Sequence, residues 1–272
     1  MQFKALLIDV DGTAVDTEHI NRSAITQVAA KAGFEVLPHH WDVIAGCDTK
    51  DIWEFLSGQR AEFPDGNNSF TFTFPNSKSF VDAYAKALEE SDGQITANEP
   101  VKQIVQEFLD NALDVAAVSN SEHHVITRAL KQTGYPTQRF SALVGKDTVL
   151  KEGMALKPSA DPYHLGIGFI NERRSAGMIE IHPRECLILE DTRTGAEAGL
   201  RTGATVLQIT DSTAPLKAKD VVALSRSFKG RYISTRKSQL FSLFQMVACP
   251  EKHFTALDTD HVTPQSKPFP SP

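Results

Sequence analysis

The 272-residue sequence has few cysteines, no long apolar run and no excess of positive charge. Its three cysteines, Cys47, Cys186 and Cys249, are widely spaced and form no CxxC pair, which argues against a disulfide framework and a structural zinc site. No apolar stretch approaches the ~20 residues that a membrane-spanning helix requires. The formal net charge of −6 argues against general nucleic-acid binding.

The first residues, MQFKALLIDVDG, contain a short apolar stretch that leads into two aspartates rather than into a small-residue cleavage site. We therefore expect no signal peptide. Together with the isolated cysteines, this pattern favours a cytoplasmic protein with no membrane partner. The length accommodates one large domain, or a core with a smaller inserted domain.

Short apolar runs alternate with helical patterns over much of the chain. Five runs are typical of strands buried on both faces, at residues 3–8, 113–118, 142–144, 186–189 and 204–209. Helical periodicity follows at residues 121–133, 158–169 and 194–202. This alternation predicts an α/β fold, with helices on both faces of a doubly wound parallel sheet.

Residues 16–93 interrupt the alternation, because helical patterns at 23–32, 51–56 and 79–90 follow the first apolar run. They predict an all-helical inserted cap, with residues 1–15 plus 94–210 as the core. Within the cap, residues 60–77 hold two prolines and a run of Asp, Gly, Asn and Ser, which favours a loop. The alternation of Phe70, Phe72 and Phe74 leaves a short β-hairpin as the alternative.

The tail after residue 210 has a different composition. Between residues 217 and 237 there are seven Lys or Arg and one acid, Asp220, and the chain ends in the proline-rich segment TPQSKPFPSP. We expect residues 211–272 to form a basic, solvated and partly disordered extension. An anion-binding surface is the alternative.

Polar residues at the ends of the apolar runs carry the chemical signal. Asp9 and Asp11, in the segment DVDGT, follow the first run and would lie at the carboxyl edge of the sheet, where ligand sites of open α/β folds form. Two carboxylates this close repel each other unless a cation compensates them. Capping aspartates in a turn are the alternative.

Three further polar segments follow later in the chain. Ser119-Asn120 can hold phosphate at a helix N-terminus, Lys157 can neutralise a transferring phosphoryl group, and Glu190-Asp191 offers oxygen ligands for Mg²⁺. Each segment alone has an ordinary explanation as a helix cap or a solvated charge. Their order along the chain predicts a site for magnesium-dependent phosphoryl transfer.

These four segments together resemble the motifs of the haloacid dehalogenase superfamily, in its branch with a helical cap that includes β-phosphoglucomutase and phosphoglycolate phosphatase. The resemblance covers about residues 1–210. It implies a Rossmann-like core in which the motif-bearing strands are adjacent and the cap closes over them. It also implies hydrolysis of a small phosphate ester, such as a sugar phosphate, with Mg²⁺ as cofactor and an aspartyl-phosphate intermediate. We expect a monomer.

The resemblance gives each matching residue a role. Asp9 is the expected nucleophile, Asp11 the general acid and then the base, and Lys157 balances the charge between Asp9 and the phosphoryl group. The expected metal ligands are Asp9, Asp191 and the backbone carbonyl of Asp11, with Glu190 as a ligand or a partner behind the ligands. The expected substrate-binding residues are Gly12, Thr13, Ser119, Asn120 and, in the cap, Lys50. A solvated lysine is the alternative for Lys50.

One departure from the family pattern bears on the reaction. Mutase-like relatives carry a histidine five residues after the aspartate found here as Asp16, whereas this chain has Asn21 there and His19 two residues earlier. A phosphatase is therefore the leading hypothesis and a phosphomutase the alternative. A dehalogenase generally lacks the second aspartate, present here as Asp11. A non-catalytic binding protein should show a broken set of motifs, and this set is complete.

Overall fold

The computed structural model describes residues 2–32, 34–44, 49–59, 76–90, 95–174, 178–211 and 218–248. Nearly all of the predicted loop at 60–77 lies outside the described residues, as do residues 45–48 of the cap and 249–272 of the tail. Among the described residues, the helices are all too short or too polar to cross a membrane.

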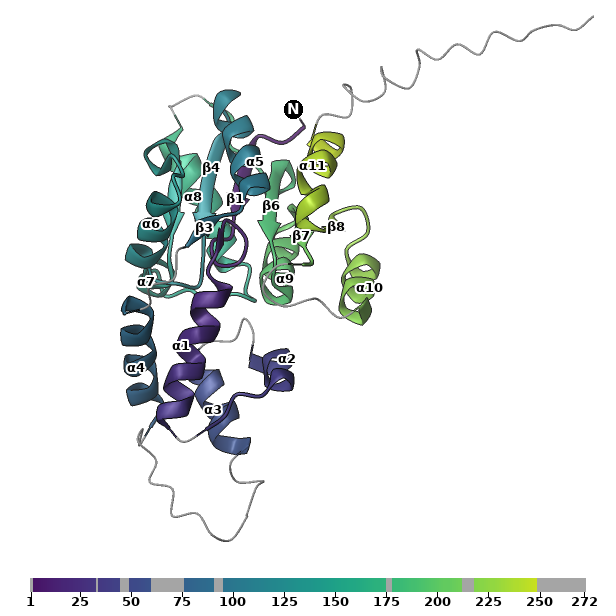
Figure 1. The fold of residues 1–272 in the computed structure, drawn as a ribbon. Coiled ribbons are helices and arrows are strands. Elements are labelled where there is room, and N and C mark those ends of the chain that lie inside the picture. The colour runs from purple at the N-terminus through teal and green to yellow at the C-terminus, as the bar shows by residue number, and fades with distance from the viewer. Residues whose placement is uncertain are drawn as a thin grey trace, which may run out of the picture.

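A six-stranded sheet forms the centre of the protein (Figure 1). The strands are parallel, in the order β5-β4-β1-β6-β7-β8. Their bounds are β1 (Ala5–Ile8), β4 (Asp114–Val118), β5 (Ala142–Val144), β6 (Cys186–Glu190), β7 (Thr205–Ile209) and β8 (Tyr232–Thr235). The first five coincide with the five apolar runs of the sequence, so the predicted doubly wound α/β fold is confirmed.

Helices cover both faces of the sheet, which explains why its inner strands are continuously apolar. Leu6 and Ile8 of β1 belong to one hydrophobic cluster, whereas Ala5 and Leu7 belong to a second, because successive side chains of a strand point to opposite faces. The first cluster includes α5 (Glu99–Asp110), α6 (His123–Gln132) and α11 (Leu240–Ala248). The second includes α7 (Lys146–Lys151), α8 (Asp161–Arg173), α9 (Arg193–Thr202) and α10 (Ala218–Ser227).

Helix α8 begins later than the sequence pattern indicated, at Asp161 rather than at Pro158. The residues before it form a turn, in which the amide of Ser159 donates to the carbonyl of Leu156 at 2.9 Å. This turn contains Lys157. The shift therefore leaves Lys157 on a loop at the edge of the sheet instead of at the start of a helix.

The inserted segment forms helices with a hydrophobic cluster of their own. They are α1 (Glu18–Lys31), α2 (Trp41–Ile44), α3 (Thr49–Gln59) and α4 (Ser77–Glu89), with a 3-10 turn, η1, at Pro38–His40. Val28, Leu56 and Phe80 belong to this cluster, which lies at one end of the molecule, beyond the sheet edge (Figure 1). A short antiparallel pair, β2 (Val15–Asp16) and β3 (Thr96–Ala97), joins the cap to the core. The predicted division into core and cap stays a prediction.

Beyond residue 210 the chain extends the sheet, so the sequence-based end of the core was placed too early. β8 pairs with β7 in parallel, from Val206↔Tyr232 to Ile209↔Thr235. Helix α11 then packs on α5, with the rings of Phe108 and Phe244 5.9 Å apart. β8 lies at the edge of the sheet and is only half-buried. Its sequence therefore lacks the continuous apolar run that marks the inner strands.

Candidate active site

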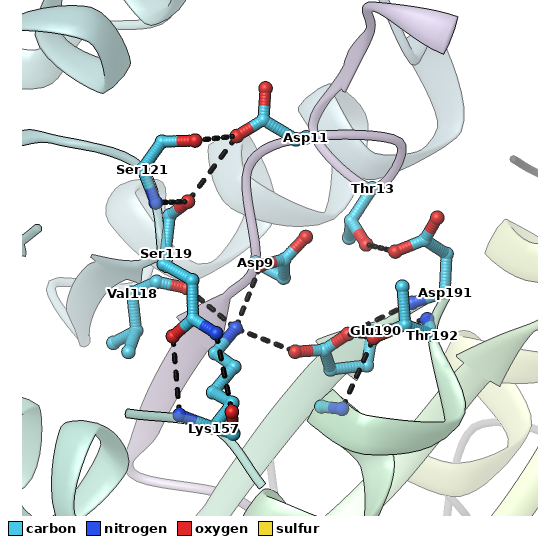
Figure 2. Close-up of polar contacts among 12 residues, drawn as sticks. Asp9, Asp11, Thr13, Val118, Ser119, Ser121, Lys157, Glu190, Asp191 and Thr192 are labelled. Carbon is cyan, nitrogen blue, oxygen red and sulfur yellow. Dashed lines mark hydrogen bonds and ion pairs between the residues drawn. The ribbon is translucent and has the colours of Figure 1, made fainter. Parts of the chain in front are cut away.

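The carboxyl ends of β1, β4 and β6 carry the predicted site residues of three motifs side by side (Figure 2). β1 lies between the other two strands, with Ile8 level with both Ala117 of β4 and Leu189 of β6. Asp9 follows β1, Ser119 follows β4, and Glu190 ends β6. Because parallel strands all end at one edge of the sheet, residues far apart in the chain meet there.

Lys157 connects the ends of these three strands. Its Nζ lies 2.7 Å from Oδ1 of Asp9 and 2.6 Å from Oε1 of Glu190, and it donates to the carbonyl of Val118 at 2.9 Å. The side chain of Lys157 is 4% exposed and that of Glu190 is 0% exposed. These charges are held out of water, where ionised groups are stable only when they are paired and hydrogen-bonded.

Negative charge exceeds positive charge in this cluster. Burial raises the pKa of Asp9 well above its usual value and Glu190 raises it further, while Lys157 acts in the opposite direction. Burial alone would lower the pKa of Lys157, but Asp9 and Glu190 outweigh this effect and raise it. Among the described residues at this edge of the sheet, the Lys157 ammonium group pairs with Asp9 and Glu190, and Asp191 adds a third buried carboxylate.

The excess of carboxylates fits a divalent cation. Asp9, Glu190 and Asp191 are all buried, and each can offer one oxygen such that the three atoms lie within 4.8 Å of one another. Carboxylate oxygens are the ligands that Mg²⁺ prefers, and a cation would relieve the mutual repulsion of these groups. The expected contribution of Asp11, through its backbone carbonyl, stays a prediction.

Glu190 is fixed by several hydrogen-bond donors. The hydroxyl of Tyr163 donates to Oε1 at 2.6 Å, and the hydroxyl of Thr192 donates to Oε2 at 3.2 Å. Gly195, in the first turn of α9, lies so near that a Cβ there would collide with the Glu190 carboxylate. This close approach explains why a glycine occupies the third position of the helix.

Asp191 is held through both its side chain and its backbone. The hydroxyl of Thr13 donates to Oδ1 at 3.0 Å, and the side-chain amide of Gln208 donates to the Asp191 carbonyl at 3.0 Å. Thr13 is itself fixed by Asn98, whose amide donates to the Thr13 carbonyl at 2.9 Å. Thr13, expected to bind substrate, therefore lies beside a candidate metal ligand, and its contact with substrate stays a prediction.

Asp11 points toward two serines, away from the carboxylate cluster (Figure 2). Oδ2 accepts hydrogen bonds from Ser121 Oγ at 2.8 Å and from Ser119 Oγ at 3.3 Å. Oδ1 accepts one from Thr17 at 3.3 Å. The expected phosphate-binding hydroxyl of Ser119 is thus directed at Asp11 in this structure, and its contact with phosphate stays a prediction.

Two other predicted substrate-binding residues shape the backbone around the site. Gly12 has a φ of 82°, a conformation that favours glycine, and its amide donates to the carbonyl of Val15 at 2.8 Å. The side chain of Asn120 accepts from the amide of Lys157 at 3.2 Å and donates to its carbonyl at 3.3 Å. They fix the loops that carry Asp11 and Lys157, while their contacts with substrate stay predictions.

In the cap, the predicted substrate-binding residue Lys50 is exposed on α3, and its Nζ lies 3.8 Å from Glu54. Its contact with substrate stays a prediction.

Asn21 of α1 lies in a chain of hydrogen bonds. It accepts one from the hydroxyl of Tyr84 at 3.0 Å and donates to the Thr17 hydroxyl at 3.5 Å. Since Thr17 donates to Asp11, this chain links helix α4 to Asp11.

Sequence reasoning did not single out several residues that hold the site in place, among them Thr17, Asn98, Ser121, Tyr163, Thr192 and Gln208. Ser121 could have been found, because it is the third polar residue in succession after β4. Tyr163 lies within α8 and Gln208 within β7, where no motif spacing marks them. Their roles are visible only once the helix and the strand are packed beside β6.

Comparison with known proteins agrees with this architecture. The family of haloacid dehalogenase-like hydrolases matches residues 6–209. A probable pseudouridine-5'-phosphatase of Saccharomyces cerevisiae is 25% identical over 246 residues, which cover 85% of this chain and 92% of that protein.

Two solved structures share the fold. A HAD family hydrolase from Deinococcus radiodurans R1, with bound phosphate and sodium, has a TM-score of 0.65 and 22% identity, covering 91% of this chain and 97% of its own. A mutant of CbbY from Rhodobacter sphaeroides, in complex with xylulose-(1,5)bisphosphate, has a TM-score of 0.63 and 17% identity, covering 86% and 93%.

Proposed function

The chain belongs to the family of haloacid dehalogenase-like hydrolases, and we propose that it is a Mg²⁺-dependent phosphatase acting through an aspartyl-phosphate at Asp9. The observation that carries the proposal is the buried cluster of Asp9, Lys157, Glu190 and Asp191 at one edge of the sheet. The similarity to a protein named as a phosphatase supports the same reaction class. The proposed substrate is a small phosphate ester, such as a sugar phosphate.

In the first half-reaction, a carboxylate oxygen of Asp9 attacks phosphorus and forms the acyl-phosphate bond as the ester P–O bond breaks. Asp11 gives its proton to the leaving oxygen. Lys157 remains hydrogen-bonded beside Asp9 and balances the charge that collects there. Bound Mg²⁺ would offset the repulsion between the carboxylate and the phosphate.

In the second half-reaction, water attacks the phosphorus and the bond to Asp9 breaks, which releases inorganic phosphate. Asp11, now ionised, accepts the proton of the attacking water, because the base of the second step is the conjugate of the acid of the first. Ser121 and Thr17 hydrogen-bond to the two oxygens of Asp11. They would keep the carboxylate oriented between the two steps.

The proposal is tested by measuring phosphate release from a panel of phosphate esters, including pseudouridine 5'-phosphate and hexose phosphates, with Mg²⁺ and with EDTA. Release should require Mg²⁺. Asp9→Asn should lower the rate by orders of magnitude, because the covalent route is lost. Asp110→Asn, a change of an exposed acid at the end of α5, is the matched control and should leave the rate unchanged.

Two outcomes would contradict the proposal. Full activity in EDTA would show that the reaction does not require Mg²⁺. A substantial rate in Asp9→Asn, with an unchanged circular dichroism spectrum, would remove the aspartyl-phosphate.

A further inference from the structure

The edge strand β8 lies beyond the part of the chain that matches the family, which ends at residue 209. Its first residue, Tyr232, is 7% exposed and directs its hydroxyl into the protein. Tyr232 and Gln208 lie near each other across the β7–β8 pair, since Tyr232 is level with Val206 and Ser234 with Gln208. A residue of the extension therefore reaches a strand that borders the candidate site.

Two short hydrogen bonds continue from Tyr232 to the site. Its hydroxyl donates to Oε1 of Gln208 at 2.8 Å, and Nε2 of Gln208 donates to the backbone carbonyl of Asp191 at 3.0 Å. Gln208 is completely buried. Both ends of its amide are thus bonded, and because an amide has one accepting and one donating end, these partners define a single orientation.

The orientation of Gln208 matters because Asp191 leaves the sheet at this point. β6 ends at Glu190, and α9 begins two residues after Asp191. The Asp191 side chain is held by Thr13 and its carbonyl by Gln208. Loss of the contact from Gln208 would free the peptide unit that orients the Asp191 carboxylate, while the contact from Thr13 would remain.

We propose that Tyr232 is a positioning residue for the metal site, acting through Gln208 on Asp191. This inference rests on the proposed function, in which Asp191 is a ligand of Mg²⁺. Partners behind metal ligands commonly change metal affinity by 10- to 100-fold when they are removed. Burial also raises the pKa of Tyr232 to about 12, so the hydroxyl remains a hydrogen-bond donor at neutral pH.

The test measures Mn²⁺ binding to the full-length protein by electron paramagnetic resonance, which reports metal affinity without turnover. Tyr232→Phe should raise the Kd for Mn²⁺ by about tenfold, the lower end of the range for partners behind ligands. The matched control is Thr210→Val, which removes a different hydroxyl contact to β8, the 3.0 Å bond from Thr210 Oγ1 to the Thr235 carbonyl. Thr210→Val should leave the Kd unchanged.

A double-mutant cycle tests the route through Gln208. Gln208→Leu should weaken Mn²⁺ binding, and adding Tyr232→Phe to it should weaken binding no further, because the link is already broken. Additive effects would show that Tyr232 acts by another route and would overturn the inference. If Tyr232→Phe does not fold, the Kd of Gln208→Leu for Mn²⁺ tests the inference by itself. An unchanged Kd in that variant also overturns the inference.

The failures of the two proposals are distinguishable. An unmodified protein that binds Mn²⁺ and releases phosphate, beside a Tyr232→Phe variant with unchanged Kd, overturns only the role of Tyr232. An unmodified protein that neither binds Mn²⁺ nor releases phosphate overturns the proposed function, and the role of Tyr232 with it.

Discussion

The Nζ atom of Lys157 lies 2.7 Å from Oδ1 of Asp9, and both side chains are almost completely buried. The same Nζ lies 2.6 Å from Glu190. One lysine thus ties the candidate nucleophile of β1 to an acid of the neighbouring strand β6. Its charge offsets the two buried carboxylates that it contacts, and in the proposed mechanism it also balances the charge on Asp9.

Removal of this lysine should therefore affect stability and activity together. Lys157→Ala leaves two buried carboxylates without their cation, and breaking a buried ion pair costs about 3–5 kcal/mol. We expect a loss of that order in the free energy of unfolding, measured by urea denaturation, and loss of phosphate release. Lys157→Arg should restore little activity, because a planar guanidinium does not replace a compact ammonium. Wild-type activity in both variants would place Lys157 outside the mechanism.

Gly195 and Gly168 provide a matched pair of helix glycines. A Cβ at Gly195 would collide with the Glu190 carboxylate, whereas a Cβ at Gly168 in α8 meets nothing within 4 Å. Gly195→Ala should therefore displace Glu190 and reduce phosphate release at least tenfold. Gly168→Ala should retain activity and gain about 0.5–1 kcal/mol of stability, because alanine costs less entropy in a helix. Equal behaviour of the two variants, in the phosphate assay and in thermal unfolding, would contradict this account of Gly195.

Asn21 bears on the choice between hydrolysis and phosphoryl transfer. An amide cannot exchange a proton near neutral pH as imidazole can, and in this structure Asn21 is hydrogen-bonded to Tyr84 and Thr17. With β-glucose 1-phosphate and a trace of the 1,6-bisphosphate, we expect free phosphate and little glucose 6-phosphate. Rapid glucose 6-phosphate formation without phosphate release would favour the mutase alternative.

His19 supplies the control for this experiment. Its side chain is 55% exposed, and its Nδ1 lies 3.9 Å from Asp16. His19→Ala should leave the hydrolysis rate unchanged. A large loss of activity in that variant would mean that His19 replaces the histidine of the mutase-like relatives.

The fold and the charged part of the site could be predicted from the sequence because both depend on local patterns. A buried strand requires a continuous apolar run, and Asp9, Lys157, Glu190 and Asp191 are each placed by the end of such a run or by the turn that precedes α8. Tyr163 could not be predicted in this way. Its contact with Glu190 depends on how α8 packs against the sheet, which no short spacing in the sequence encodes.

β8, in the extension after residue 210, also could not be predicted from a local sequence pattern. β8 pairs with one neighbour and its two middle residues are only half-buried, so its residues resemble a polar loop more than a strand. The clustered Lys and Arg around it led to the expectation of a solvated tail. The sequence pattern does not reveal that this segment pairs with β7, and it is this pairing that makes it a strand.

Cys186 gives a prediction for alkaline stability. Burial raises the pKa of its thiol to about 12, whereas an unperturbed cysteine has a pKa of about 8.5. Between these two values the folded protein therefore keeps a proton that the unfolded chain has lost. The unfolded state then binds fewer protons, and stability falls as pH rises between these two values.

The free energy of unfolding of the unmodified protein should therefore fall between pH 8 and pH 10, at ~1.4 kcal/mol per pH unit for one proton. In the Cys186→Ala variant this fall should be smaller by about 1–2 kcal/mol. Urea denaturation at both pH values measures the difference. Cys47 and Cys249 are present in both proteins and cancel in the comparison. Parallel losses in the two proteins would contradict the assignment of this effect to Cys186.

The central position of β1 has a consequence for synthesis on the ribosome. Ala5–Ile8 is translated before its two neighbours, Asp114–Val118 and Cys186–Glu190, which follow only after the whole cap has been made. At the roughly 5–20 residues per second of translation, this apolar strand waits for several seconds without a partner. We expect nascent chains that stop before β6 to depend on chaperones that shield apolar segments, because the middle of the sheet cannot close until β6 has left the exit tunnel.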